Sequence, residues 1–134
     1  MFQRDQAMLD VNPDTVCRLI ALAKEFHAQE AVSLPEESSN PTDDLTSSVL
    51  AAYSDDATLG EFRSIVADLE PDQQQQVVGL LWLGRGDYEF DEWQAALEYA
   101  ADAWNERTAD YLISHPLLAD YLTEGLEKHD YRCD

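Results

Sequence analysis

The side chains best suited to chemistry in this sequence are three histidines and two cysteines. An imidazole can act as a general base or bind a metal ion, and a thiolate can act as a nucleophile or a ligand. His129 and Cys133 stand at a spacing that suits two zinc ligands, but a zinc site needs further ligands and no second pair is visible. There is no Gly-x-Ser-x-Gly motif, and no serine or cysteine has a histidine at motif spacing. The sequence therefore predicts no catalytic residue, no metal and no cofactor.

The other histidines and cysteines have structural interpretations. Cys17 lies near the buried side of the first predicted helix and is expected to be a small core residue, while Cys133 lies near the end of the chain. Two cysteines make no disulfide framework, so we expect no cross-linked fold. His27 is expected to be a cation at the end of the first helix, where the helix dipole is negative. His115 precedes Pro116, which predicts a helix break there.

The segment Gly84-Arg85-Gly86-Asp87 resembles three functional motifs and fits none of them well. A dinucleotide fingerprint would need a third glycine where Glu89 stands. A calcium loop would place Arg85 at a position that requires an oxygen ligand. An Arg-Gly-Asp adhesion tripeptide would need an extracellular protein. We interpret the segment as a tight turn in which Gly84 and Gly86 adopt positive φ and Arg85 or Asp87 ties the turn to nearby helix ends.

Glu98, Asp102, Glu106 and Asp110 form a stripe of like charges at a spacing of four residues. Such a stripe could be a metal ridge or a docking surface for a basic partner. A carboxylate-bridged dimetal site would need Glu-x-x-His pairs, and the sequence contains none. We interpret the stripe as a solvent-exposed helix face that Arg107 partly neutralises.

Apolar residues at spacings of three and four predict the helices that must position these groups. Asn12-Pro13-Asp14, Ser54-Asp55-Asp56 and Glu70-Pro71 are helix start signals. Residues 1–11 are expected to be loose, and residues 31–44, rich in proline, serine and acids, form a surface loop. The predicted helices cover 13–29, a short segment from Leu45 to Tyr53, 57–69, 71–84, 91–113 and 116–128.

The central element of the predicted fold is the helix over 71–84. Its run Val77–Leu83 is apolar except for Gly79, and it is preceded by a Gln-rich turn and followed by Gly84, which favours a buried helix over a strand. The large aromatic residues stand at helical spacing and are expected in the core. No hairpin signal occurs. The sequence thus predicts an all-α, compact bundle of five or six helices, forming one domain over 12–130.

Acidic side chains dominate the composition and exclude several functions. The 28 acidic residues and 8 Lys and Arg give a net charge of −20. This disfavours nucleic-acid binding and anionic membranes, and no stretch is long and apolar enough to span a bilayer. The start of the chain lacks a signal core, so we expect a cytoplasmic protein. The acidity is typical of a solubilising surface, of adaptation to a salty cytoplasm, or of nucleic-acid mimicry.

Two segments resemble a family of short, mostly proteobacterial proteins catalogued as a domain of unknown function. The first is LLWLGRGD at 80–87, and YLISHPLLADYL at 111–122 is similar to the closing segment of that family. The likeness covers about residues 55–127. The resemblance implies a small intracellular bacterial protein, and it supplies no reaction, ligand or catalytic residue.

A well-patterned core without an assembled catalytic constellation favours a non-enzymatic protein that binds another macromolecule. The expected contact surface is acidic, which suits a basic protein partner. Arg85, Asp87 and Tyr88 are the expected contact residues, because connectors carry function more often than core positions. Two alternatives stay open: a nucleic-acid mimic that inhibits a DNA-binding protein, and a cryptic hydrolase or metal-dependent enzyme.

Overall fold

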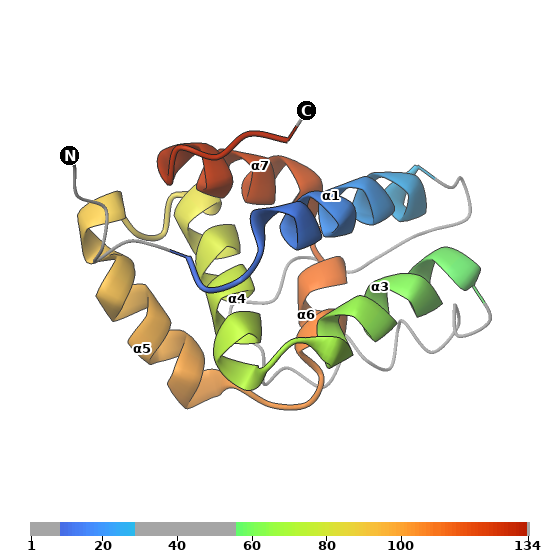
Figure 1. Ribbon diagram of the computed structural model, residues 1–134, viewed down its shortest axis with the longest axis horizontal. Coiled ribbons are helices and arrows are strands. Elements are labelled where there is room, and N and C mark those ends of the chain that lie inside the picture. The colour runs from blue at the N-terminus through green and yellow to red at the C-terminus, as the bar shows by residue number, and fades with distance from the viewer. Residues whose placement is uncertain (1–8, 29–55, 134) are drawn as a thin grey trace.

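The computed structural model describes residues 9–28 and 56–133, and within them the chain is an all-α single-domain bundle without strands (Figure 1). The predicted loop at 31–44 and the predicted helix from Leu45 to Tyr53 lie outside the described residues, as do residues 1–8. The helices are α1 (Pro13–His27), α3 (Ala57–Asp68), α4 (Pro71–Arg85), the 3-10 helix η3 (Phe90–Glu92), α5 (Trp93–Ala103), α6 (Thr108–Ile113) and α7 (Leu118–Lys128).

The first three described helices begin at their predicted start signals. The side chain of Asn12 accepts a hydrogen bond from the backbone N–H of Asp14 at 2.8 Å. The carboxylate of Asp56 accepts one from the N–H of Leu59 at 3.0 Å. Helix α4 begins with Pro71 at its first position. Each cap satisfies backbone N–H groups that a helix leaves unbonded, so local sequence is enough to place these starts.

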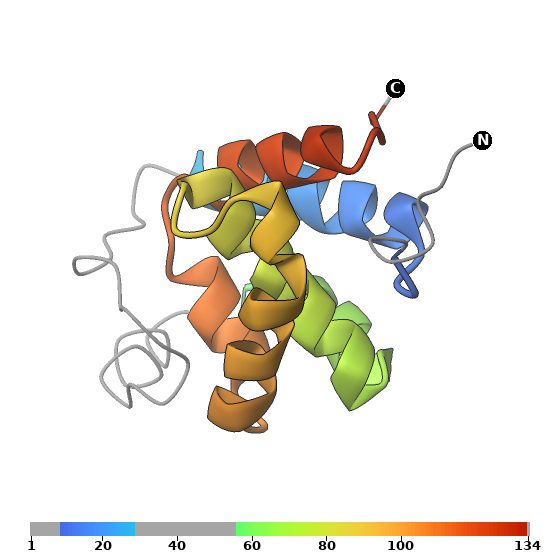
Figure 2. The ribbon, with the colours of Figure 1, turned by 90° about the vertical axis from the view of Figure 1, so that its left-hand side faces the viewer.

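Helix α4 is the centre of the bundle, as its apolar pattern predicts. It packs against α7 and α5, while α1 packs against α7 and α3, an arrangement that two perpendicular views show (Figures 1 and 2). Every residue of the run Val77–Leu83 is buried. A helix that is apolar on all sides must be enclosed by its neighbours, which is why the other helices gather around this one.

Two glycines let the backbones of α4 and α7 touch. A Cβ on Gly84 would lie 1.8 Å from the carbonyl oxygen of Tyr121, and a Cβ on Gly125 would lie 2.4 Å from that of Leu80. The expectation that both Gly84 and Gly86 take positive φ is therefore wrong for Gly84, which lies inside α4 and is needed for close packing. Gly86 does take positive φ, at 93°, and ends the helix.

The single helix predicted over 91–113 is wrong, because the chain breaks after α5. Trp104 is extended, and its indole N–H donates to the side chain of Gln74 on α4 at 2.7 Å. The side chain of Asn105 accepts from the N–H of Arg107 at 2.7 Å, and the hydroxyl of Thr108 donates to the Asn105 carbonyl at 2.8 Å. These local side-chain bonds compete with helical backbone bonds and stop the helix.

The break also divides the predicted acidic stripe. Glu98 and Asp102 lie on α5, Glu106 lies in the connector, and Asp110 lies on α6. Asp110 forms an ion pair with Arg63 of α3, with 2.7 Å between the side-chain nitrogen and oxygen. The four carboxylates therefore do not form one helix face.

The chain immediately before α1 is attached to α4. Leu9 and Val11 are buried, within the segment that the sequence marks as loose. The side-chain oxygen of Gln76 accepts from the backbone N–H groups of Asp10 and Val11, at 2.8 and 2.9 Å. A buried glutamine thus replaces the backbone partner that these two residues lack.

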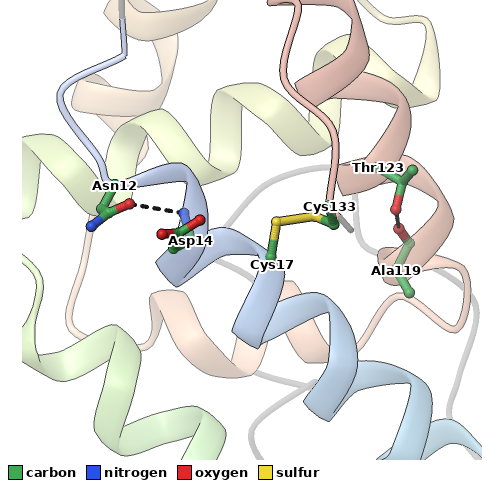
Figure 3. The surroundings of a disulfide bond; sticks show 6 residues. All are labelled: Asn12, Asp14, Cys17, Ala119, Thr123 and Cys133. Atoms are coloured by element: carbon green, nitrogen blue, oxygen red, sulfur yellow. Dashed lines mark hydrogen bonds between the residues drawn. A yellow bond between two sulfur atoms is a disulfide. The ribbon is translucent and has the colours of Figure 1, made fainter.

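Cys17 and Cys133 form a disulfide, which corrects the expectation of two separate cysteines (Figure 3). Cys17 lies on α1 and is half-buried, so it is not a core thiol. After α7 the chain turns back at Asp130, whose φ is 67°, and the N–H of Tyr131 donates to the carbonyl of Leu126 at 2.9 Å. This reversal brings residue 133 to α1, although 116 positions separate the two cysteines.

Candidate functional site

The end of α4 organises a polar cluster around Arg85. The left-handed Gly86 lets the N–H of Asp87 donate back to the carbonyl of Trp82 at 2.9 Å. The side chain of Asp87 then faces Arg85, which donates to its carboxylate from Nε at 3.1 Å and from Nη2 at 2.6 Å. Two bonds to one carboxylate oxygen hold the turn closed, whereas the sequence predicts that Arg85 or Asp87 ties the turn to nearby helix ends.

Arg85 also reaches a buried histidine in the connection between α6 and α7. The ring of His115 is completely buried, and its Nδ1 lies 2.9 Å from the carbonyl oxygen of Tyr111. Since a carbonyl only accepts, Nδ1 carries the proton and Nε2 accepts from Nη1 of Arg85 at 3.0 Å. The geometry therefore assigns a neutral imidazole held between a guanidinium and a helix carbonyl.

Tyr111 and Trp82 complete the cluster on its buried side. The indole N–H of Trp82 donates to the Tyr111 hydroxyl at 2.9 Å. Burial raises the pKa of Tyr111 despite this bond and the nearby guanidinium. Burial by itself would lower the pKa of Arg85, but the bond to Asp87 and the neighbouring Tyr111 raise it. The cluster thus keeps a fixed positive charge at the end of α4.

This cluster links the end of α4 to the connection between α6 and α7, and its histidine is not accessible to a substrate. Both nitrogens of His115 are engaged in bonds, and the ring is shielded from solvent. Of the predicted contact residues, Arg85 turns inward, with its side chain 16% exposed, whereas the side chain of Asp87 is 40% exposed. Tyr88 is half-buried and packs its ring 6.0 Å from that of Trp82. The sequence did not reveal that Arg85 and His115 meet.

His27 is the second histidine that joins two elements. Its Nε2 donates to the carbonyl of Ile113 at 2.8 Å and so connects α1 to the end of α6. Burial lowers the pKa of His27, and the bond to Ile113 only partly opposes this effect. The expectation of a cationic His27 at the helix end is therefore wrong, because desolvation favours the neutral ring.

His129 and Cys133 do not form a pair of metal ligands. The sulfur of Cys133 is bonded to Cys17, and the ring of His129 packs between aromatic side chains. Its centroid lies 5.0 Å from that of Phe90 and 4.4 Å from that of Trp93. Across residues 9–28 and 56–133, no group of three His, Cys, Asp or Glu side chains is placed to hold a metal ion.

A small cavity of about 200 Å³ lies where α3, α4 and α6 meet. The ion pair of Arg63 and Asp110 lies on its wall. Gln74 also lines it and donates to the carbonyl of Val66 at 2.8 Å. These three polar side chains are bonded to one another, to the backbone or to the indole of Trp104, and Glu106 and Arg107 also line the cavity.

A run of exposed acidic side chains extends from the turn after α4 through η3 and α5. Residues 86–106 contain seven acidic side chains and no Lys or Arg, and all seven are exposed. The same segment carries Phe90 and Tyr99, which are 40% and 46% exposed and are two of the three large exposed hydrophobic residues in the described part of the chain. We call the exposed acidic and aromatic side chains of residues 87–102 the α5 face.

Electrostatics and ring contacts place the turn after α4 next to part of α5. Burial raises the pKa of Tyr88, and the nearby Tyr99, Asp87 and Glu92 raise it further. Tyr99 packs 5.3 Å from the ring of Trp82, measured between centroids. Residues of the turn and of α5, about ten positions apart in sequence, therefore share one surface around Trp82.

Comparisons with known proteins identify a family and no activity. The family described as "Protein of unknown function (DUF3775)" matches residues 59–131, which is more than half of the chain and extends from α3 to the turn after α7. No curated protein and no solved structure matches the chain. In the described residues, no helix has the length and apolar character needed to cross a membrane.

Proposed function

This chain belongs to the DUF3775 family, and we propose that it is a non-enzymatic protein that binds a basic segment of a partner protein through the α5 face. The observation that carries the proposal is the composition of this face. Its acidic side chains have no neighbouring Lys or Arg within residues 86–106, and two large aromatic side chains stand exposed among them.

Charge complementarity selects the class of partner. Asp91, Glu98 and Asp102 are exposed, and the last two are four residues apart on α5, so their potentials add on one side of the helix. Like charges at this spacing destabilise an isolated helix by a few tenths of a kcal/mol. A Lys- or Arg-rich segment would remove this repulsion and would be steered toward the face from solution.

The aromatic side chains supply the contact area that charges alone do not. Tyr99 and Phe90 present ring surface beside carboxylates, and an arginine or lysine can stack on such a ring while it pairs with an acid. Aromatic residues are enriched among the positions that dominate binding energy. The underlying Trp82, which is buried, fixes the ring of Tyr99 from below.

The basic residue nearest to this face in the sequence does not compete for it. The guanidinium of Arg85 donates to Asp87 and His115 and therefore does not extend over the α5 face. The exposed part of Asp87 remains at the edge of the α5 face. The sequence-based proposal that Arg85, Asp87 and Tyr88 contact a partner is thus refined: Asp87 and Tyr88 touch it, and Arg85 supports them.

The experiment titrates the full chain with a synthetic Lys- and Arg-rich peptide while backbone amide shifts are followed by NMR. We expect the shifts to concentrate in residues 87–102. The affinity should fall about tenfold between low and physiological salt, since screening weakens exposed charge pairs. The triple variant Asp91→Asn/Glu98→Gln/Asp102→Asn should lower the affinity by about tenfold or more, at roughly 0.5–1 kcal/mol for each exposed pair.

A matched control also removes three negative charges, but from other surfaces of the protein. The variant Glu25→Gln/Asp68→Asn/Glu124→Gln changes exposed acids on α1, α3 and α7. It should bind the peptide nearly as well as the unmodified chain. If both triple variants lose affinity equally, or if the shifts spread over the whole surface, the peptide senses only net charge and the α5 face is not the site.

A further inference from the structure

We propose that Cys17 and Cys133 form a reversible thiol–disulfide exchange site, which holds the end of the C-terminal segment, residues 132 and 133, on α1 when oxidised and releases it when reduced. The inference goes beyond the proposed function and does not depend on it. It rests on three observations: the surface position of the disulfide, the backbone hydrogen bonds of the C-terminal segment, and the direct packing of α1 on α7.

The disulfide lies at the surface of the protein. Cys133 is exposed and Cys17 is half-buried on the second turn of α1, with 5.6 Å between their Cα atoms (Figure 3). A thiol reductant can therefore reach the bond from solvent. Exposed disulfides are the labile and regulatory ones, whereas buried ones resist reduction.

The disulfide holds the last residues of the C-terminal segment. The backbone N–H groups of His129, Asp130 and Tyr131 donate to carbonyls in the last turn of α7, at 2.9 Å each. Arg132 and Cys133 make no backbone-to-backbone hydrogen bond within the described residues. The sulfur–sulfur bond is thus what fixes the end of this segment to α1.

The hydrophobic core does not require the disulfide. Helices α1 and α7 pack directly on each other, and Val16, Leu19, Leu122 and Leu126 are buried in one continuous cluster. Cys17 only touches the edge of that cluster. Breaking the bond should therefore free the segment near Cys133 and leave the helices folded.

The exchange reaction balances with a dithiol reductant. One thiolate of the dithiol attacks the exposed sulfur of Cys133, the bond to Cys17 breaks, and the Cys17 sulfur leaves as a thiolate that takes up a proton. The second thiol of the reductant then loses its proton, attacks its own sulfur in the mixed disulfide and displaces Cys133, which is protonated. The protein gains two electrons and two protons, and the dithiol becomes a cyclic disulfide.

The test uses the full chain purified without reductant. We expect no free thiol before treatment, and two after incubation with dithiothreitol in the absence of denaturant, as counted by maleimide labelling and mass spectrometry. Far-UV circular dichroism should keep its helical signal. Hydrogen exchange of the His129, Asp130 and Tyr131 amides should rise about tenfold or more, because their bonds to the last turn of α7 open more often once the chain end is free.

Two variants separate the exchange site from the rest of the molecule. Cys133→Ser should show the fast exchange of the reduced protein and should not respond to dithiothreitol. Thr123→Ser, on the neighbouring surface of α7, keeps the hydroxyl that donates to the carbonyl of Ala119 at 2.8 Å and should respond like the unmodified chain (Figure 3).

Three results would overturn the proposal. The first is that both thiols stay free in an oxidised glutathione buffer. The second is that the bond is reduced only in denaturant, which would make it a permanent cross-link. The third is that reduction abolishes the helical signal.

Discussion

Single polar side chains decide how the segments of this chain are attached to one another. Gln76 binds two backbone N–H groups ahead of α1, Gln74 links α3 to the indole of Trp104, and His27 links α1 to α6. A buried polar group costs free energy unless it is bonded, so each of these side chains is useful only in its folded position. Their types do not reveal this role, because a glutamine in a Gln-rich stretch looks like any surface glutamine.

His27 makes the stability of the fold depend on pH. Burial holds its folded-state pKa below the ordinary value of 6.5, so below that pH the unfolded chain binds more protons than the folded one. The contribution of His27 to the free energy of unfolding should therefore fall as the pH drops from 7.5 to 5. In the variant His27→Gln, whose amide can still donate to Ile113, this part of the fall should be absent.

Urea denaturation of both proteins at the two pH values measures the difference. The other titratable groups are common to both chains, so the stability lead of the unmodified chain should shrink at pH 5. A lead that stays constant or grows on acidification would contradict a lowered pKa for His27.

At the scale of elements, the contact between α4 and α7 organises the bundle. Gly84 and Gly125 face the opposite backbone, so the two helices approach more closely than any side chain allows. The sequence marks Gly84 as a helix end, since glycine is common there, and the same residue type also serves close packing. Only the partner helix distinguishes the two roles.

The variant Gly84→Ala should therefore be strongly destabilising. Its Cβ would lie 1.8 Å from the carbonyl oxygen of Tyr121, and backbone cannot move aside as a side chain can. We expect a loss of about 3 kcal/mol or more in the free energy of unfolding, measured by chemical denaturation.

Gly60→Ala is the matched control. Gly60 lies within α3, and a Cβ there would have no atom within 4 Å. Alanine is the better helix former, so this variant should gain up to about 1 kcal/mol. Similar effects of the two substitutions would show that the α4–α7 contact does not depend on Gly84.

At the scale of the whole molecule, a net charge of −20 opposes the compact state. The described residues offset part of it with ion pairs between elements, such as Arg63 with Asp110 and Arg18 with Glu61. Exposed pairs contribute little, so most of the repulsion remains and is reduced only by salt.

Added salt should accordingly stabilise the protein. We expect the melting temperature to rise by about 5 °C between low salt and about 0.5 M NaCl, because the Debye length shrinks. The variant Glu25→Gln/Asp68→Asn/Glu124→Gln should melt higher at low salt and respond less. A melting temperature that falls with salt would show that favourable ion pairs, rather than repulsion, dominate the surface.

Local sequence signals were enough to predict the all-α class, the starts of α1, α3 and α4, and the burial of Val77–Leu83. These features follow from caps, prolines and apolar spacing, all of which act over a few neighbouring residues.

The pairing of distant groups depends on how the helices pack and could not be predicted. The tertiary structure joined Cys17 to Cys133, turned Arg85 toward His115, and broke the helix at Trp104 by offering its indole a partner on α4. Such contacts depend on how elements pack, and a pattern read along one chain has no information about the neighbour across the core.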